Sequence, residues 1–433
     1  MEKTAKSPWL WIPPLYFAEG IPYFLVNNIS VIMFTRMGME NGQMAFFTSL
    51  LYLPWVIKPL WSPFVDILRT KRWWVIAMQV TMALLFMTIA LTLPHPEPSA
   101  IASHSTPASI FVLTLCLFWL SAFASATHDI AADGYYMLAL DQKSQSVFVG
   151  IRSTFYRLSS IFGQGVLVVI AGLLETSLGD IPLAWKVTLL VSSALLFCIT
   201  LCLTFTMPHP IQDSPRNVAP KDIFREFGRT FATFFKKKQI SVALLFMLLY
   251  RLPEAFLVKM MNPFLLAPHY DGGLGLSTEA VGLVYGTAGA AALTLGGILG
   301  GVFAARRGLK RSLWPMALAL ALPCLCFVFL SVFQPSNIWI IGSCVVFDQF
   351  GYGFGFTAYM LYMMYFSEGE FKTAHYSLCT AFMALSMMLP GMLAGYMQEW
   401  LGYTNFFIFV MICTLVTVLV TFAIKVDPEY GKN

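Results

Sequence analysis

The sequence predicts an all-helical integral membrane protein with about twelve transmembrane helices in two pseudo-symmetric six-helix bundles. Composition, the succession of apolar segments and the placement of the charges predict this fold. Of the 433 residues, 58% are hydrophobic and 11% are charged, whereas soluble domains carry about 25% charged residues. Such a chain is too apolar for a soluble fold, and its composition is the opposite of that of a disordered chain. This excludes a cytosolic enzyme, a secreted disulfide scaffold and a nucleic-acid-binding module.

Twelve segments are long and apolar enough to cross a membrane, which takes about 20 mostly apolar residues. The first six are residues 9–34, 43–65, 73–93, 109–140, 148–174 and 185–207. The second six are residues 239–267, 278–304, 312–333, 337–366, 374–399 and 404–424. Residues 208–238 form the only long hydrophilic stretch. We therefore expect a bundle in residues 1–207, a basic linker in 208–238 and a second bundle in 239–433.

Lys and Arg residues gather in alternate connections between these segments. One set contains the polar start of the chain, residues 69–72, Lys143, the linker and residues 306–311, whereas the other set contains only Arg36. Because cytoplasmic loops carry the excess of Lys and Arg, we expect both termini and the linker to be cytoplasmic. We therefore expect a multi-pass protein of the inner (cytoplasmic) membrane.

Two short basic loops support the division into halves. Residues 66–72 lie between the second and third segments, and residues 306–311 lie between the eighth and ninth. One such loop could simply follow the topology rule. Its recurrence at both equivalent positions favours the duplicated architecture of major facilitator transporters.

Charged residues inside the apolar segments are few and concentrated. The candidates for a functional role are Glu19, Asp129, Asp133, Arg157, Arg251, Glu254, Lys259 and Asp348. Each costs at least about 2.5–3.5 kcal/mol to insert, so such residues usually have a function. All but Arg157 belong to the first, fourth, seventh and tenth segments, which line the central cavity in the duplicated fold.

Asp129 and Asp133 are four residues apart, so both carboxylates project from one face of a helix. Two close carboxylates in a medium of low dielectric constant can take up and release a proton. We interpret them as the proton-coupling site; the alternative is a structural ion pair with Arg157 on the next helix. His128 lies about 100° further round the helix and need not join them.

The remaining polar residues of the cavity-lining segments have two interpretations each. Arg251 either contacts an anionic solute or is neutralised by Glu254 three residues later. Glu19 lies in a helix interrupted by proline and glycine, with Asn27 and Asn28 further along, and such breaks often border a cavity. Tyrosines such as Tyr250 either stack on a sugar or pack in the core. The predicted substrate cavity comprises Glu19, Asn27, Asn28, Arg157, Tyr250, Arg251, Glu254, Lys259, Asp348 and Gln349.

The glycines and cysteines of the sequence indicate helix packing and not a nucleotide-binding or metal-binding site. Gly351, Gly353 and Gly355 lack the strand and turn of a nucleotide-binding loop, and residues 296–301 contain overlapping GxxxG spacings typical of close helix contacts. The eight cysteines lie in apolar runs without a CxxC motif. No motif of a hydrolase, zinc enzyme or kinase occurs. We therefore expect neither an enzyme nor a cofactor or metal.

Four stretches resemble AmpG-type muropeptide permeases and the related acetyl-CoA transporters. They are residues 58–66 (KPLWSPFVD) followed by 71–73, residues 126–133 (ATHDIAAD), residues 16–22 (YFAEGIP) and residues 249–264. Three positions depart from the family pattern: His128 replaces a glutamine, Gly134 replaces a small alanine, and the basic loop lacks its usual glycine.

The resemblance implies proton-driven import of a cell-wall sugar or muropeptide in peptidoglycan recycling, with protons carried on Asp129 and Asp133. It also implies a gating loop with Lys58, Trp61, Asp66, Arg69 and Arg72. The alternative solutes are acetyl-CoA, a siderophore or a drug; a transporter-like receptor or membrane acyltransferase is a further alternative. The expected partners are a small solute, protons and the lipid bilayer, with no nucleic acid, for a monomeric protein.

Overall fold

The computed structural model describes residues 7–211, 213–214, 220–369, 371–427 and 430. Within these residues the chain is helical almost throughout, and the only β-bridge pairs Met39 with Thr106. Several crossings consist of two or more helical pieces, because prolines, glycines and π-helical turns interrupt them.

The first six crossings precede the linker. They are formed by η1 (Pro8–Leu10), α1 (Ile12–Phe24), the π-helical turn η2 (Leu25–Ile29) and α2 (Ser30–Arg36); α3 (Asn41–Leu50) and α4 (Leu53–Leu68); α5 (Lys71–Thr92); η3 (Ala108–Phe111) and α7 (Val112–Ala139); α8 (Gln142–Ile161), the π-helical turn η4 (Phe162–Leu167) and α9 (Val168–Leu178); and α10 (Ile181–Thr206). A short helix, α6 (Pro98–Ala102), lies in the connection between α5 and η3.

The last six crossings follow a helix within the linker, α11 (Pro220–Phe235). They are formed by α12 (Ile240–Leu249) and α13 (Leu252–Leu266); α14 (Thr278–Val281), the π-helical turn η6 (Gly282–Gly289) and α15 (Ala290–Arg307); α16 (Leu309–Ala321) and α17 (Cys324–Phe333); α18 (Ile338–Ser367); and α19 (Lys372–Ala423), which contains two crossings. The short helix η5 (His269–Asp271) lies between α13 and α14.

All twelve predicted segments are helical. Nine helical stretches within the described residues are long and apolar enough to span a membrane. One of them contains both crossings of α19, which reverses direction at Gly402 (φ 73°). The other two crossings fall outside this set: α3 and α4 are each short, and Asp348 and Gln349 lower the hydropathy of α18.

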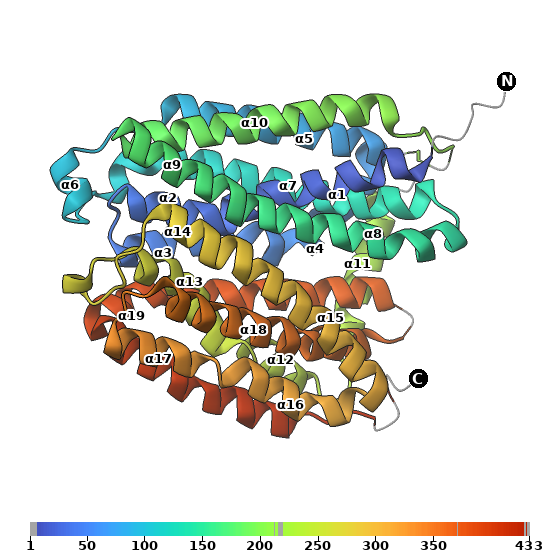
Figure 1. Cartoon of the computed structure of the whole chain (residues 1–433). Helices are drawn as coiled ribbons and strands as arrows, with labels where there is room; N and C mark the ends of the chain where they lie inside the picture. The colour runs from blue at the N-terminus through green and yellow to red at the C-terminus, as the bar shows by residue number, and fades with distance from the viewer. Residues whose placement is uncertain (1–6, 212, 215–219, 370, 428–429, 431–433) are drawn as a thin grey trace.

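The helices form two sets that lie side by side (Figure 1). Helices α1–α10 make up the N-terminal set, α12–α19 make up the C-terminal set, and α11 lies between them at one end. We call this end the terminal end, because α1 begins there and α19 ends there, and the opposite end the far end.

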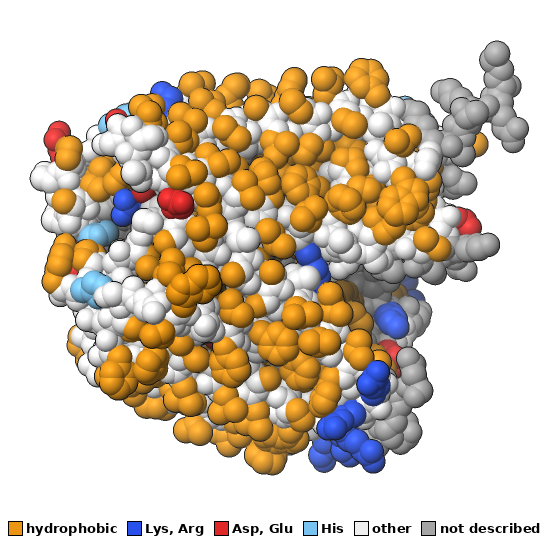
Figure 2. Space-filling model, in the orientation of Figure 1, with side chains coloured by type: hydrophobic (Ala, Val, Ile, Leu, Met, Phe, Trp, Pro, Cys, Tyr) orange, Lys and Arg blue, Asp and Glu red, His pale blue; other side chains and the backbone are white. Residues whose placement is uncertain are grey.

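The surface of the bundle matches a membrane protein. Large apolar side chains cover the face seen in Figure 2, and Leu201, Phe205, Phe333 and Phe422 are each more than half exposed. A cluster of cations gathers at the terminal end, where exposed residues include Arg306, Arg307, Lys310 and Arg311. An apolar belt with a basic edge is the surface expected of a protein that spans a bilayer.

Glycines allow helices of the C-terminal set to pack at backbone contact, as the sequence predicts. A Cβ atom at Gly296 of α15 would lie 2.2 Å from the carbonyl oxygen of Phe350, and one at Gly353 of α18 would lie 2.1 Å from that of Leu293. On the other side of α18, a Cβ atom at Gly351 would lie 2.2 Å from the carbonyl oxygen of Ala319 in α16. Small residues thus hold α15, α18 and α16 together.

Candidate functional site

Two ion pairs join three helices of the N-terminal set. The Lys58 ammonium group of α4 donates to the Asp129 carboxylate of α7. One turn further along α7, Asp133 lies 2.5 Å from the Arg152 guanidinium of α8. The predicted geometry of the two carboxylates on one helix face therefore agrees with the contacts, and each carboxylate has its own cation.

The cluster is open to one side. The Asp129 and Asp133 side chains are 25% and 39% exposed, and Arg152 is 30% exposed. Figure 2 shows the molecule hollowed at the terminal end, between the two sets of helices. Aromatic rings hold the Arg152 guanidinium group in place, since it lies 4.6 Å from the Tyr16 ring centre and 5.4 Å from that of Tyr136.

Glu19 of α1 completes the cluster. It is buried, and one of its carboxyl oxygen atoms has no hydrogen-bond partner among the described residues. Asp129 and Asp133 are its electrostatic neighbours. The cluster thus places three carboxyl groups, of Glu19, Asp129 and Asp133, beside the two cations Lys58 and Arg152.

Arg157 does not pair with either aspartate, so that alternative is wrong. It follows Arg152 by five residues on α8 and therefore points about 140° away from it. Its guanidinium group lies against Gly297 of α15, where a Cβ atom would be 3.3 Å from it. Arg157 thus contacts the C-terminal set. His128 also stays apart from the aspartates, because its Nε2 atom lies 3.0 Å from the Gln79 amide in the buried contact of α7 with α5.

The predicted gating residues are mostly helical. Lys58, Trp61 and Asp66 belong to α4, so the connection to α5 comprises only Arg69 and Thr70. Prolines at positions 59 and 63 do not end α4. The Trp61 ring packs on Phe123 of α7, whereas the Asp66 side chain lies outside the described residues.

Arg69 and Arg72 lie at the terminal end. The Arg69 guanidinium group is 5.7 Å from the Trp73 ring centre, and Arg72 donates to the Thr204 carbonyl oxygen of α10 at 2.6 Å. The Asp213 carboxylate accepts the backbone N–H groups of Lys71 and Arg72 at the start of α5. Arg72 and Asp213 thus tie the start of α5 to the end of α10 and border a surface pocket of about 450 Å³.

Arg251 lies in the break between α12 and α13. It donates to the Tyr352 hydroxyl group and lies 4.6 Å from the Phe356 ring centre and 5.8 Å from that of Tyr359. No direct ion pair joins the described side chains of Arg251 and Glu254, although the two are electrostatic neighbours. Tyr250 packs in the core of the C-terminal set and donates to the Gly355 carbonyl oxygen, which agrees with the packing interpretation.

A small polar cavity of about 10 Å³ lies where the two sets meet. Its polar lining residues are Asn27, Asn28, Tyr52, Lys259 and Asn262. The Lys259 ammonium group donates to the Thr48 hydroxyl group of α3 at 3.1 Å and so joins the two sets. The amide oxygens of Asn27 and Asn262 are buried without a hydrogen-bond partner. The sequence prediction did not include Thr48, Tyr52 or Asn262.

Glu254, Asp348 and Gln349 lie deeper in the C-terminal set. Glu254 is 1% exposed and Asp348 is 2% exposed. The Gln349 amide donates to Asp348 at 3.1 Å. These residues do not border the small cavity.

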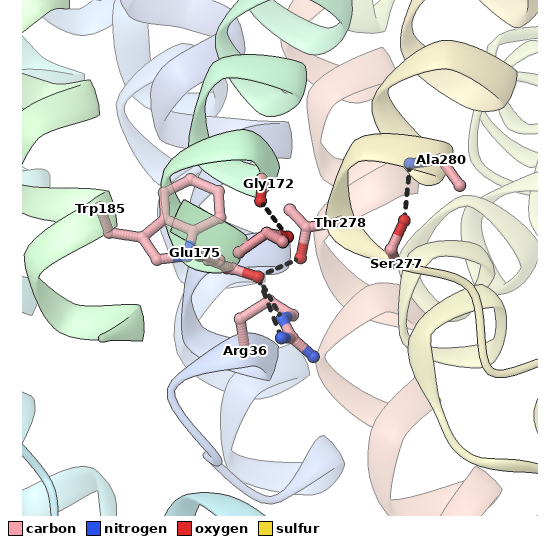
Figure 3. A network of polar contacts seen from close by, with 8 residues as sticks. Arg36, Gly172, Glu175, Trp185, Ser277, Thr278 and Ala280 are labelled. Atoms are coloured by element: carbon pink, nitrogen blue, oxygen red, sulfur yellow. Dashed lines mark hydrogen bonds and ion pairs between the residues drawn. The ribbon is translucent and has the colours of Figure 1, made fainter. Parts of the chain in front are cut away.

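The far end is sealed by contacts between the two sets. Glu175 of α9 accepts from Arg36 at 2.9 Å and from the Trp185 indole at 2.9 Å. It also accepts from the Thr278 hydroxyl group at the start of α14, at 2.7 Å (Figure 3). A Cβ atom at Gly172 would lie 2.2 Å from the Glu279 backbone nitrogen, so these two helices touch at their backbones.

A second seal joins α3 to α19 at the same end. The Asn41 amide donates to Gln398 at 2.7 Å and to the Tyr403 hydroxyl group at 3.1 Å, and the Gly42 N–H group donates to Glu399 at 2.7 Å. The first seal joins the fifth crossing to the eighth, and this one joins the second to the eleventh. The pair matches the pseudo-symmetry of the duplicated fold.

The family model of the Major Facilitator Superfamily matches residues 14–373. The chain belongs to the Major Facilitator Superfamily. It is 25% identical over 424 residues to the anhydromuropeptide permease of Escherichia coli strain K12, covering 96% of this chain and 80% of the relative. It is 24% identical to "Putative transporter AmpG 1" of Rickettsia bellii, covering 87% of this chain and 88% of the relative. These relatives confirm the predicted resemblance.

The solved structures confirm the fold. A D-xylose-proton symporter has a TM-score of 0.71 and 11% identity, with 98% of each chain covered. This facilitator-superfamily protein is accordingly a membrane transporter for a small molecule.

Proposed function

We propose that this transporter imports an anhydromuropeptide-like sugar or sugar–peptide together with protons, by alternating access. The observation that carries the proposal is the contrast between the two ends. The far end is sealed twice, whereas Asp129 and Asp133, in the last three turns of α7, are partly exposed. With the terminal end cytoplasmic, as the Lys and Arg distribution indicates, this conformation is the inward-facing one.

The two helix sets are the proposed moving bodies, with residues 208–238 as their linker. Transport requires the seals at the far end to open while the terminal end closes. Both seals consist of side-chain hydrogen bonds and glycine contacts, which separate without unfolding a helix. Opening them would give the polar residues where the sets meet, such as Asn27 and Lys259, access to the outside.

Proton coupling is assigned to Asp129 and Asp133. In the outward-facing state a proton on Asp129 would neutralise it and release Lys58. In the inward-facing state Lys58 and Arg152 pair with the two carboxylates, which favours the ionised form and so expels the proton into the cytoplasm. Glu19, an electrostatic neighbour of Asp129, offers a further carboxyl group for the proton.

The solute class follows from the resemblance and from the polar groups between the sets. The anhydromuropeptide permease of Escherichia coli aligns over nearly the whole of this chain. Lys259 and Arg251 suit the carboxylates of a muropeptide, and the free amide oxygens of Asn27 and Asn262 suit sugar hydroxyl groups.

Uptake into proteoliposomes tests the proposal. We expect radiolabelled anhydromuropeptide to accumulate inside when the lumen is alkaline, and its addition to acidify a lumen that contains a pH-sensitive dye. Accumulation of acetyl-CoA, a siderophore or a drug in its place would overturn the solute assignment. Solute flux without proton movement would overturn the coupling, and the absence of flux for every solute would favour a receptor or an acyltransferase.

A further inference from the structure

The Glu254 carboxyl group is buried without a partner. Glu254 lies in the first turn of α13 and is 1% exposed. Both of its oxygen atoms lack a hydrogen-bond partner among the described residues. An ionised carboxylate in such a place loses its hydration without gaining a hydrogen bond or an ion pair, at a cost of several kcal/mol.

The groups that face Glu254 do not compensate a negative charge. Its electrostatic neighbour in the break before α13 is Arg251, whose guanidinium group is directed to the Tyr352 hydroxyl group and the Phe356 ring. Its electrostatic neighbours on other elements are the Asp348 carboxyl group and Tyr352 of α18, Tyr285 of η6 and Cys324 of α17. The closest charges therefore comprise one cation and a second carboxyl group.

The number of buried charges near Glu254 also indicates that a negative charge there would be uncompensated. Asp348 is 2% exposed, and the Gln349 amide is its hydrogen-bond partner. With both carboxyl groups ionised, Arg251 would balance only one of two buried negative charges. Two like charges this close in low dielectric are avoided by protonating one of them, and Glu254 is the one without a donor.

A solute cannot supply the missing partner in this conformation. Glu254 does not line the 10 Å³ cavity between the two sets, and its side chain is sealed from solvent. The free oxygens of Glu254 accordingly indicate a carboxylic acid.

We propose that Glu254, opposite Asp348, is a second proton-binding site of the transporter, located in the C-terminal set. This rests on the proposed proton coupling and extends it, because the site holds its proton in the conformation in which Asp129 and Asp133 are ion-paired. The two sets then carry separate protons, and Glu254 exchanges its own when the break at Tyr250–Arg251 opens to water. One more proton crosses per solute than the N-terminal cluster alone would carry.

The number of protons per solute tests the proposal. It is measured in proteoliposomes as the membrane potential that just stops net muropeptide flux at a fixed pH gradient. We expect Glu254→Gln, which keeps the shape of the neutral acid, to carry one proton fewer per solute than the wild type. Glu97→Gln removes an exposed carboxylate before α6 and should leave the ratio unchanged.

Asp129→Asn distinguishes a failure of the second proton site at Glu254 from a failure of proton coupling as a whole. If Asp129→Asn lowers the ratio and Glu254→Gln does not, the second site is overturned while proton coupling stands. If neither substitution changes the ratio, coupling through Asp129 fails as well.

If Glu254→Gln does not transport, infrared spectroscopy still tests the proposal, because it does not depend on solute flux. The infrared spectrum of the purified protein should contain a C=O stretching band of a buried carboxylic acid that disappears in Glu254→Gln and persists in Glu97→Gln. An unchanged spectrum would contradict the proposal. So would a loss of affinity in Glu254→Gln confined to solutes with an amino group, since that result would make Glu254 an ionised solute ligand.

Discussion

Lys58 and Arg152 hold the two carboxylates of α7 from different helices, and each pair is partly exposed. Exposed ion pairs contribute about 0–1 kcal/mol to stability, whereas removing one partner of a buried pair costs about 3–5 kcal/mol. The pairs of this cluster lie between these limits. Their main effect is therefore on the charge state of the aspartates in each conformation, more than on the stability of the bundle.

Replacing Lys58 tests this view. In Lys58→Met, Asp129 loses its cation while Glu19 and Asp133 remain close, so Asp129 should retain its proton in the inward-facing state. We expect gradient-driven uptake to fall at least about tenfold, which corresponds to about 1.4 kcal/mol. Lys58→Arg should keep part of the activity because it preserves the charge.

Lys372→Met is the matched control, since Lys372 is exposed at the start of α19. It should transport like the wild type. If Lys58→Met also transports at the wild-type rate with an unchanged pH dependence, the ion pair has no part in coupling.

The π-helical turns η4 and η6 bring the fifth and eighth crossings together at glycines. A Cβ atom at Gly286 would lie 1.7 Å from the Gln164 carbonyl oxygen, and one at Gly165 would lie 2.5 Å from the Thr287 hydroxyl oxygen. Such turns often occur at functional positions of helices. They belong to the same two crossings as the seal at Glu175 and Thr278, so we expect the contact to contribute to closing the far end.

Gly286→Ala should prevent the far end from closing fully, since overpacking costs about 1–3 kcal/mol. The separation of fluorophores at Glu97→Cys and Tyr270→Cys measures this closure in a background without the eight native cysteines. Both positions are exposed at the far end, one on each helix set (Figure 1). We expect a longer mean separation in Gly286→Ala.

Gly301→Ala is the control on the same crossing, because a Cβ atom there meets nothing within 4 Å. Equal separations in Gly286→Ala, Gly301→Ala and the wild type would contradict the role of the glycine contact.

The hydrogen bond from Thr278 to Glu175 crosses between the sets, whereas that from Ala280 to Ser277 stays within α14 (Figure 3). A hydrogen bond to a charged group contributes about 1.5–3 kcal/mol. Thr278→Val should therefore shift the conformational equilibrium about tenfold or more towards an open far end, as measured by the same fluorophore pair.

Ser277→Ala removes a helix cap worth about 1 kcal/mol and should lower the melting temperature without changing the fluorophore separation. A similar shift in both variants would show that the cap, and not the contact between the sets, controls the seal.

Much of this architecture could be predicted because apolar length and charge placement are local properties. The twelve crossings and the glycine contacts of α15 and α18 follow from them. The helix α11 within the linker and the π-helical turns do not, since tertiary packing decides them. Arg152 was missed in favour of Arg157 because the rotation of α8 relative to α7 is set by packing, which the sequence of either helix does not specify.

The two seals and the exposed ion pairs together describe a transporter closed at one end and open at the other. Their positions obey the pseudo-symmetry of two six-helix halves, and in the proposed alternating access a rotation of the helix sets opens one end while it closes the other. Coupling to protons then requires that protonating Asp129 change the free energy of this rotation. The account depends on this link.

Solute exchange compared with uphill uptake in Asp129→Asn tests the link most directly. Asparagine mimics the protonated aspartate, so exchange of labelled for unlabelled muropeptide across proteoliposome membranes should continue. Accumulation driven by a proton gradient should fall well below the wild-type level. Gradient-driven accumulation at the wild-type level in Asp129→Asn would contradict the account, and it would do so decisively if Asp129→Asn/Asp133→Asn behaved in the same way.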